Sequence, residues 1–304
     1  MSGKSNLAAS VRARLLNRAK ADGADFTLIL TRYALERTLY RLSVSTYRDY
    51  FLLKGALLFD LWFDVPHRPT RDADLLGFGP SDLDSLVAIF RDLCAMPVED
   101  GIEFDPDTVS AGAIRKEANY AGVRVTFTGI LAGARCPVQV DIGFGDVVTP
   151  DPEEVIYPLL LDDLPAPHLR VYPRYTVVSE KFEAMVKLGM ANSRLKDYFD
   201  LWVLARYSEF EGDVLQEAIR ATFQRRQTPL PLSVPLGLSR GFFEDMGKQM
   251  QWKAFLRKNR LEEFPLSDVV GEISLFLMPV VEASSNEQVF QGQWPPGGAW
   301  NTNG

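Results

Sequence analysis

The pattern of hydrophobic and polar residues changes character about halfway along the chain. Residues 5–44 have the apolar spacing of two amphipathic helices, interrupted by a glycine-containing turn at 22–25. Short apolar or alternating runs then predict strands separated by helices. These strand-like runs are 51–55, 72–78, 102–104, 123–128 and 138–144. From Ser179 onward the apolar residues recur at helical spacing, with patterns at 213–224, 240–260 and 267–282.

This change of period predicts an α/β part with a mixed sheet flanked by helices, followed by a helical C-terminal domain. We expect N-terminal helices over residues 1–44, the α/β domain over 45–175 and the helical domain over 176–283. Residues 149–173 are rich in proline and are the expected linker. Residues 284–304 are rich in Gly, Asn, Gln and Pro, a composition that is typical of a disordered tail.

The bulk composition is that of a globular protein. Of the 304 residues, 46% are hydrophobic and 24% are charged, which allows a substantial core. The formal net charge of −7 excludes a protein coated in positive charge, but not a local nucleic-acid groove. Cys94 and Cys136 have no metal-ligand spacing, a pattern that suits a reducing compartment. We see neither a signal-peptide core nor a membrane-spanning apolar stretch, and therefore expect a cytoplasmic protein.

Three aspartates on two predicted strands form the main candidate site. Asp72 and Asp74 are one residue apart, so on a strand they point to the same face, roughly 6–7 Å apart along the backbone. Asp141 occupies the polar side of the alternating strand 138–144. If these strands are neighbours, three carboxylates converge, and their repulsion calls for a divalent cation. An isolated Asp-x-Asp pair is more often two solvated acids. The presence of the third acid favours a metal site instead, and we expect it to hold Mg²⁺ or Mn²⁺.

Two further segments have features of phosphate-binding sites. Lys54-Gly55 ends a strand and leads into a helix, which presents backbone N–H groups to an anion. Lys54 or the Thr70 hydroxyl could help hold a triphosphate there. Most strand–glycine–helix turns bind nothing, and this one gains weight because it precedes the paired acids. Lys181 borders an apolar helix stripe, so it either extends outward to solvent or points into a cleft at a phosphate, and we favour the second.

The segment after Lys181 also has a purely structural interpretation. Arg194 and Asp197 are spaced i,i+3, and Lys196 and Asp200 are spaced i,i+4. Each such pair stabilises a helix by only a few tenths of a kcal/mol, roughly 0.2–0.5. For Arg194, Lys196 and Asp200, helix stabilisation explains the spacing as well as a functional role does.

Four of these segments, taken in order, resemble the AbiEii/AbiGii-type nucleotidyltransferase toxins, a branch of the DNA polymerase β-like nucleotidyltransferase superfamily. The resemblance covers about residues 25–210 and rests on the combination of motifs. The matching segments are Leu53–Leu58, Arg68-x-Thr70-x-Asp72-x-Asp74, Val140–Asp146, and Ser179-Glu180-Lys181 with Arg194-x-Lys196-Asp197-x-x-Asp200.

The resemblance implies a nucleotidyltransferase core and a role for each matching residue. Asp72 and Asp74 would ligate the catalytic metals, with Asp141 as the third carboxylate. Lys181 would contact the nucleotide phosphates, and Asp197 would complete the set in the helical half. The chain departs from the family at Ala56, where a second glycine or a serine is common. Alanine forbids some backbone geometries that glycine permits.

The resemblance also implies a reaction and partners. A nucleoside monophosphate would pass from a nucleoside triphosphate to an RNA hydroxyl, at the 3′ end of a tRNA, and a cognate antitoxin protein would neutralise the enzyme. A basic segment at 248–260, with Trp252 and Phe255 among its cations, could track RNA, or its aromatics could simply be core. The alternatives are transfer to a small molecule or a protein side chain, and a catalytically silent nucleotide-binding module.

Overall fold

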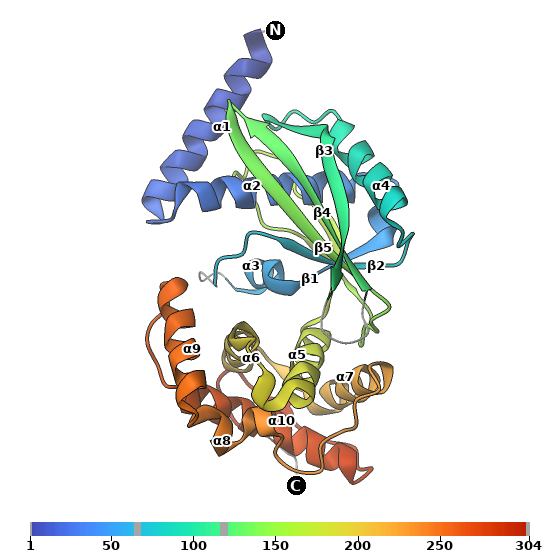
Figure 1. The fold of residues 1–304 in the computed structure, drawn as a ribbon, viewed down its shortest axis with the longest axis vertical. Coiled ribbons are helices and arrows are strands. Elements are labelled where there is room, and N and C mark those ends of the chain that lie inside the picture. The colour runs from blue at the N-terminus through green and yellow to red at the C-terminus, as the bar shows by residue number, and fades with distance from the viewer. Residues whose placement is uncertain (1, 64–67, 116–120, 302–304) are drawn as a thin grey trace. The chain divides into compact units, whose positions relative to one another are not determined.

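Strands of the first part of the chain form a seven-stranded mixed sheet. The second part of the chain, where the apolar residues have helical spacing, forms a separate group of helices (Figure 1). The computed structural model describes residues 2–63, 68–115 and 121–301. These residues form two compact units. The first comprises residues up to Gly145 together with Glu153–Tyr172, and the second comprises Asp146–Pro152 together with residues from Pro173 onward. The predicted fold class is confirmed, and the N-terminal helices belong to the same unit as the sheet.

The first unit contains four α-helices and seven strands among its described residues. The helices are α1 (Ser2–Ala21), α2 (Phe26–Ser43), α3 (Leu58–Trp62) and α4 (Leu83–Ala95). The strands are β1 (Phe51–Lys54), β2 (Ala73–Gly77), β3 (Ile102–Arg115), β4 (Ala121–Leu131), β5 (Ala134–Phe144), β6 (Glu153–Ile156) and β7 (His168–Val171). The break between α1 and α2 lies where it was predicted, because Asp25 caps α2 by accepting a hydrogen bond from the Leu28 amide at 2.9 Å.

The strand order is β3-β4-β5-β2-β1-β7-β6. The central strand β2 runs antiparallel to β1 and parallel to β5, and β4 runs antiparallel to β5. The strand that carries Asp74 is therefore a direct neighbour of the strand that carries Asp141. This adjacency was the condition on which the predicted convergence of the acids depended.

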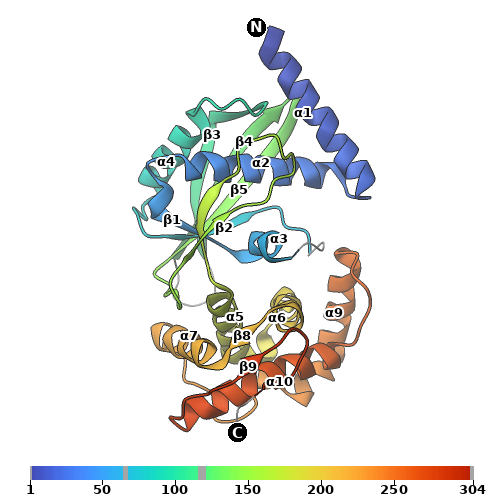
Figure 2. The same cartoon turned by 180° about the vertical axis from the view of Figure 1, so that it is seen from behind.

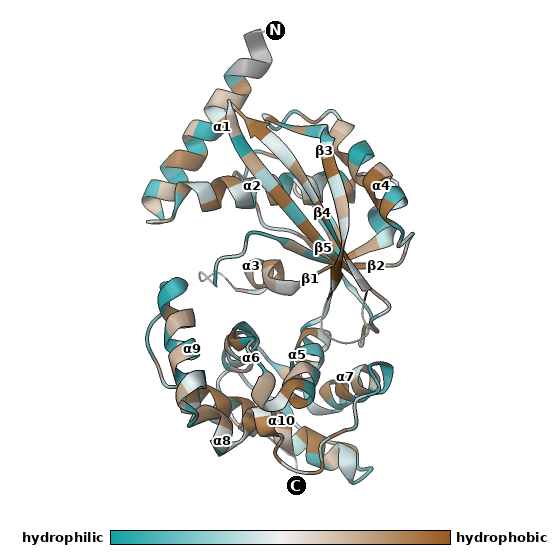
Figure 3. Cartoon of the chain, in the orientation of Figure 1, coloured by the Kyte–Doolittle hydropathy of each residue, from teal (hydrophilic) through white to brown (hydrophobic). Residues whose placement is uncertain are grey.

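One face of the long strands is apolar and packs against helices. Figure 3 shows hydrophobic and hydrophilic residues alternating along β4 and β5. On the apolar face, Phe127 contacts Phe90 of α4 at a ring-centroid distance of 6.0 Å, and the Arg41 guanidinium of α2 lies 4.7 Å from the Phe104 ring. Helix α2 crosses these strands in both views (Figures 1 and 2). The other face carries Arg124 and Thr126 on β4 and is polar.

The proline-rich segment 149–173 is not a linker, and that prediction was wrong. It contains β6 and β7, and β7 extends the sheet by pairing in parallel with β1. Its prolines bracket the strands, with Pro152 before β6 and Pro167 before β7. Proline lacks the N–H that a ladder requires, so it is tolerated at the boundaries of edge strands. A high proline content here therefore marks the ends of short strands.

The second unit contains six helices and a two-stranded sheet among its described residues. These elements are α5 (Arg174–Leu188), α6 (Leu195–Tyr207), β8 (Phe210–Glu211), α7 (Gly212–Arg225), α8 (Arg240–Phe243), α9 (Met246–Lys258), α10 (Leu266–Ser285) and β9 (Gln293–Trp294).

The expected disorder after residue 284 is contradicted over the described residues. Strand β9 pairs with β8, and Trp294 is buried, donating its indole N–H to the Ala205 carbonyl at 2.6 Å. Trp300 stacks on Phe276 of α10 and donates to its carbonyl at 2.8 Å. The composition is polar overall, but the buried area of two tryptophans is enough to hold the segment in place.

Candidate active site

The sheet register brings the three predicted acids to one end of β2. Asp74 on β2 lies opposite Asp141 on β5 and opposite Lys54 on β1, so these side chains share one face of the sheet. Asp72 immediately precedes β2, and its Oδ2 lies 3.5 Å from the amide end of the Gln139 side chain on β5. Gln139 is two residues before Asp141 on the same face. The structure therefore brings Asp72, Asp74 and Asp141 into one neighbourhood.

Arg124 of β4 completes this neighbourhood as the counter-ion of the acids. It lies opposite Asp141 and donates to both carboxylate oxygens, from Nε and from Nη2, at 2.8 Å each. The hydrogen bonds to Asp141 raise the pKa of Arg124 above its usual value, and the charges of Asp72 and Asp74 add to this shift. The Asp141 side chain is 8% exposed, whereas that of Arg124 is 45% exposed. The guanidinium is thus bonded to Asp141 and lies close enough to Asp72 and Asp74 for their charges to act on it.

The donor chemistry fits a hard divalent cation, but the present arrangement favours Arg124. Three carboxylates are the ligands that Mg²⁺ and Mn²⁺ prefer. Within residues 2–63, 68–115 and 121–301, however, no three His, Cys, Asp or Glu side chains stand close enough together to hold a metal ion. Asp141 directs both oxygens to Arg124. A metal ion shared by all three acids therefore requires Asp141 to exchange Arg124 for the ion.

Gly55 forms the wall beside Asp74. Its φ of +77° lies in the left-handed region, and a Cβ built on it would come within 2.2 Å of Asp74 Oδ2. Glycine is required there both by the backbone conformation and by the close approach. The neighbouring Ala56, where the resemblance predicts a second glycine or a serine, does not have a positive φ and is buried. Alanine is therefore accommodated at that position without strain.

Lys54 and Thr70 flank the acids. Lys54 Nζ donates to the Tyr172 hydroxyl at 3.3 Å and lies 4.8 Å from the centre of that ring. The Thr70 hydroxyl donates to Asp72 Oδ1 at 2.6 Å and so orients this carboxylate. Binding of phosphate by Lys54, Gly55 or Thr70 stays a prediction.

The other two predicted site residues lie in the second unit and are in direct contact with each other. Lys181 of α5 donates to Asp197 Oδ1 at 2.8 Å and to Asp200 Oδ2 at 2.7 Å, both on α6. Both acids are at most 1% exposed, and the Lys181 side chain is 12% exposed. The Arg194–Asp197 pair is present as predicted, at 2.8 Å, whereas Asp200 pairs with Lys181 and not with Lys196 as its spacing suggested.

This arrangement keeps Asp197 ionised although it is buried. Burial alone would raise the pKa of Asp197, but the charges of Lys181 and then of Arg194 outweigh it and bring the pKa below the usual value. Asp197 therefore acts as a fixed anion, and it holds the Lys181 side chain in place together with Asp200. Neither carboxylate has enough exposed surface to meet a ligand directly.

Sequence reasoning missed Arg124, Gln139 and the role of Asp200. A signal for Arg124 was present, because it alternates with Val123 and Val125 and so belongs to a polar face. The tight turn at Ala132-Gly133 fixes the β4–β5 register. When this register is followed from the turn along both strands, Arg124 lies opposite Asp141. No comparable local signal existed for Asp200, whose partner is on another helix.

The structure tests part of the prediction that the basic segment, now helix α9, contacts RNA. Trp252 is 2% exposed, donates to the Phe264 carbonyl at 2.8 Å and belongs to the core, and Lys248 is buried with its Nζ on the Asn192 carbonyl. Stacking of bases on Trp252 is therefore contradicted. Lys253 and Arg257 are exposed, so the outer side of α9 still presents cations.

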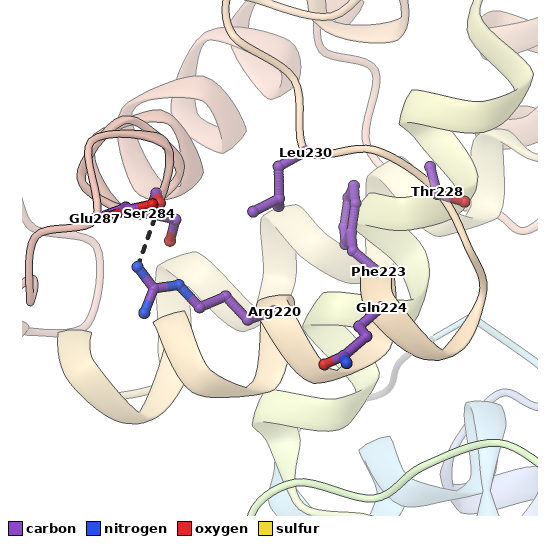
Figure 4. Close-up of a pocket in the computed structure, with 7 residues that line it drawn as sticks. All are labelled: Arg220, Phe223, Gln224, Thr228, Leu230, Ser284 and Glu287. Carbon is purple, nitrogen blue, oxygen red and sulfur yellow. Dashed lines mark hydrogen bonds between the residues drawn. The ribbon is translucent and has the colours of Figure 1, made fainter.

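One cavity of the second unit holds none of the predicted residues. It has a volume of about 460 Å³, and Figure 4 shows that side chains of α7, the loop after it and the end of α10 line it. Arg220 on its wall donates to the Ser284 carbonyl at 3.2 Å. Its residues are Arg220, Phe223, Gln224, Thr228, Leu230, Ser284 and Glu287.

Comparison with known proteins supplies independent information. A family model described as nucleotidyl transferase AbiEii toxin, type IV TA system, matches residues 37–272, well over half of the chain. JHP933 from Helicobacter pylori has a similar structure, with a TM-score of 0.48 and 12% identity over 86% of this chain and 94% of that chain. A second H. pylori structure, described as a candidate nucleotidyltransferase, gives a TM-score of 0.47 and 12% identity over 85% and 96%. Among curated proteins none matches significantly.

Proposed function

The chain belongs to the AbiEii family of nucleotidyl transferase toxins, and from this premise we propose that it moves a nucleoside monophosphate from a nucleoside triphosphate to a hydroxyl of RNA. The acceptor that we propose is the 3′ end of a tRNA, with pyrophosphate as the second product. That the protein is a nucleotidyltransferase follows from its family. The proposal about its substrates is supported by the gathering of Asp72, Asp74 and Asp141 at one end of β2.

In our proposal the reaction uses Mg²⁺ or Mn²⁺, and Asp72, Asp74 and Asp141 would be its ligands. When bound, such an ion neutralises the phosphates and lowers the pKa of the attacking hydroxyl. In this proposal Asp141 of β5 also accepts the proton of the attacking hydroxyl. Arg124 is paired with Asp141 in this structure, and Asp141 would have to give up that pair to serve as a metal ligand.

The remaining residues bind and position phosphate. The Gly55 backbone and the Lys54 ammonium hold the pyrophosphate on the β1 side of Asp74, since Gly55 abuts that carboxylate. A phosphate contact by Lys181 stays a prediction that rests on the motif resemblance. Asp197 acts through Lys181 and is a positioning residue, because it is 1% exposed and bonded to the lysine. Phosphoryl chemistry depends mainly on such positioning and charge stabilisation.

The family also defines the biological setting. Membership of a type IV toxin–antitoxin family implies an antitoxin partner. No helix among the described residues has the length and apolar character to span a membrane. We place the protein in the cytoplasm, for which the two buried free thiols, Cys94 and Cys136, give support.

The test is nucleotide incorporation. The purified protein is incubated with each labelled nucleoside triphosphate, Mg²⁺ and total cellular RNA, and label is then sought in RNA and in protein. Asp72→Asn and Asp74→Asn should each lose several orders of magnitude of activity, roughly 10³-fold or more. Asp84→Asn, at an exposed position on α4, is the matched control and should be unaffected.

A second readout does not depend on turnover. Mn²⁺ should raise the melting temperature of the wild-type protein, and the rise should disappear in Asp72→Asn and Asp74→Asn but persist in Asp84→Asn. Label found in protein, or near-normal incorporation by both acid variants, would contradict the proposed reaction.

A further inference from the structure

A second feature, with both polar and apolar walls, lies near the carboxylates within the first unit. It is a cavity of about 370 Å³, within the range of small-ligand sites, roughly 300–1,000 Å³. Its walls include hydroxyl and amide groups from β4, β5, the start of α2 and the irregular part of β3 between Asp105 and Ser110. They also include the apolar residues Phe127, Pro137 and Val138. The residues that matter here are Thr31, Arg71, Thr108, Thr126, Thr128 and Gln139.

This cavity lies close to the acids. Gln139 lines it, and the amide end of the same side chain lies 3.5 Å from Asp72 Oδ2. Arg71, also in the lining, is the residue before Asp72. Thr126 lies opposite Gln139 in the β4–β5 register, two residues from the Arg124–Asp141 pair and on the same face. A molecule in the cavity is therefore next to the site where the carboxylates gather.

The strand order indicates on which side of the acids the cavity lies. In the order β4-β5-β2-β1, the pair β2 and β5 carries Asp74 and Asp141, with β1 on one side and β4 on the other. Gly55 approaches Asp74 from the β1 side, where the leaving pyrophosphate is held in our proposal. In phosphoryl transfer the attacking and leaving oxygens lie roughly in line, on opposite sides of phosphorus. In our proposal the attacking hydroxyl then arrives from the side away from β1, and the strands that line the cavity, β4 and β5, lie on that side.

We infer that this cavity binds the terminal nucleoside of the acceptor, the nucleoside that carries the attacking hydroxyl. The inference rests on the proposed function and specifies how the second substrate binds.

The chemistry of the walls fits a nucleoside. Neutral hydroxyl and amide groups match the donors and acceptors of a base and a ribose. Thr126 shares its hydroxyl hydrogen bond with Ser110 at 3.0 Å, and Thr31 donates to the Thr27 carbonyl at 3.0 Å, so both oxygens are already oriented. Arg71 supplies one cation, which suits the single phosphodiester that precedes a terminal nucleoside.

The kinetic test uses deacylated tRNA as the acceptor and the isosteric variant Thr126→Val. Valine keeps the volume and the strand preference of threonine and removes only the hydroxyl. At saturating nucleoside triphosphate, KM for tRNA should rise about threefold to tenfold, the effect of one lost hydrogen bond. KM for the nucleotide should stay unchanged. Thr46→Val, exposed in the turn after α2, is the matched control and should leave both constants unchanged.

Two results would overturn the inference. One is an unchanged KM for tRNA in both Thr126→Val and the double variant Thr126→Val/Thr128→Val. The other is a rise in KM for the nucleotide instead, which would assign the cavity to the donor. These outcomes differ from failure of the proposed function, in which the wild-type protein transfers no label to RNA and the inference falls with it.

A measurement without turnover separates binding from catalysis. An RNA with a 3′-terminal 4-thiouridine is cross-linked to the Asp74→Asn protein, and the modified peptides are mapped. Cross-links to residues 126–139 support the assignment, and Thr126→Val should reduce them relative to Thr46→Val. Cross-links confined to the second unit would contradict it.

Discussion

Replacement of Gly55 by alanine tests whether the approach of the backbone to Asp74 shapes the active site. Gly55 has φ +77°, and an added Cβ would lie 2.2 Å from Asp74 Oδ2 and 2.8 Å from Asp74 Cβ. Gly133, in the turn between β4 and β5, has a nearly identical φ of +80° and no atom within 4 Å of an added Cβ. The two substitutions therefore share the backbone strain and differ in the contact with Asp74.

The magnitudes follow from these distances. A left-handed alanine costs about 1–2 kcal/mol at either position. At residue 55 the Asp74 side chain must also move by about 1 Å to reach an ordinary contact distance, since non-bonded atoms are stable only near 3.5 Å. Overpacking of this kind adds about 1–3 kcal/mol of destabilisation. A displacement of about 1 Å at a reacting centre costs about 10²-fold in rate.

Two assays on the two variants measure these effects. Urea unfolding should show a larger loss of stability for Gly55→Ala than for Gly133→Ala. Nucleotide incorporation should fall about 10²-fold in Gly55→Ala and remain close to the wild-type rate in Gly133→Ala. Equal destabilisation of the two variants, with full incorporation by both, would refute the reasoning that Gly55 sets the position of Asp74.

Further predictions concern both units. Lys181→Met should destabilise the protein by about 3–5 kcal/mol in urea unfolding, because two buried carboxylates lose their cation, whereas Lys181→Arg should retain most of the stability. Asp197 has a lowered pKa, so its stabilising contribution is present above about pH 4 and lost as the pH falls further; Asp197→Asn should show a smaller acid-induced drop in melting temperature. Trp294→Ala should cost about 3–5 kcal/mol, where a disordered tail would give no change. Arg124→Gln should enlarge the Mn²⁺-induced rise in melting temperature, since Asp141 no longer has a competing cation.

The sequence by itself determined the local features of the protein. The break between α1 and α2, the strands β1 to β5 and the helices of the C-terminal half followed from periodicity, whereas β6 and β7 did not. The faces of Asp74 and Asp141 followed from strand alternation, because side-chain direction depends only on position within the strand. The four spaced motifs were enough to identify the nucleotidyltransferase family, which the family model confirmed.

Only the tertiary structure decided which of these features meet. The pairing of β2 with β5 joins segments far apart in the chain, and no local period encodes such a pairing. The same holds for the capture of Asp141 by Arg124 and for the choice of Lys181 as the partner of Asp200. In each case a buried charged group requires an opposite charge as its partner. Which group this is depends on the side chains that packing places next to it. Spacing along one helix or strand predicts the direction of a side chain, whereas its partner depends on the neighbouring elements.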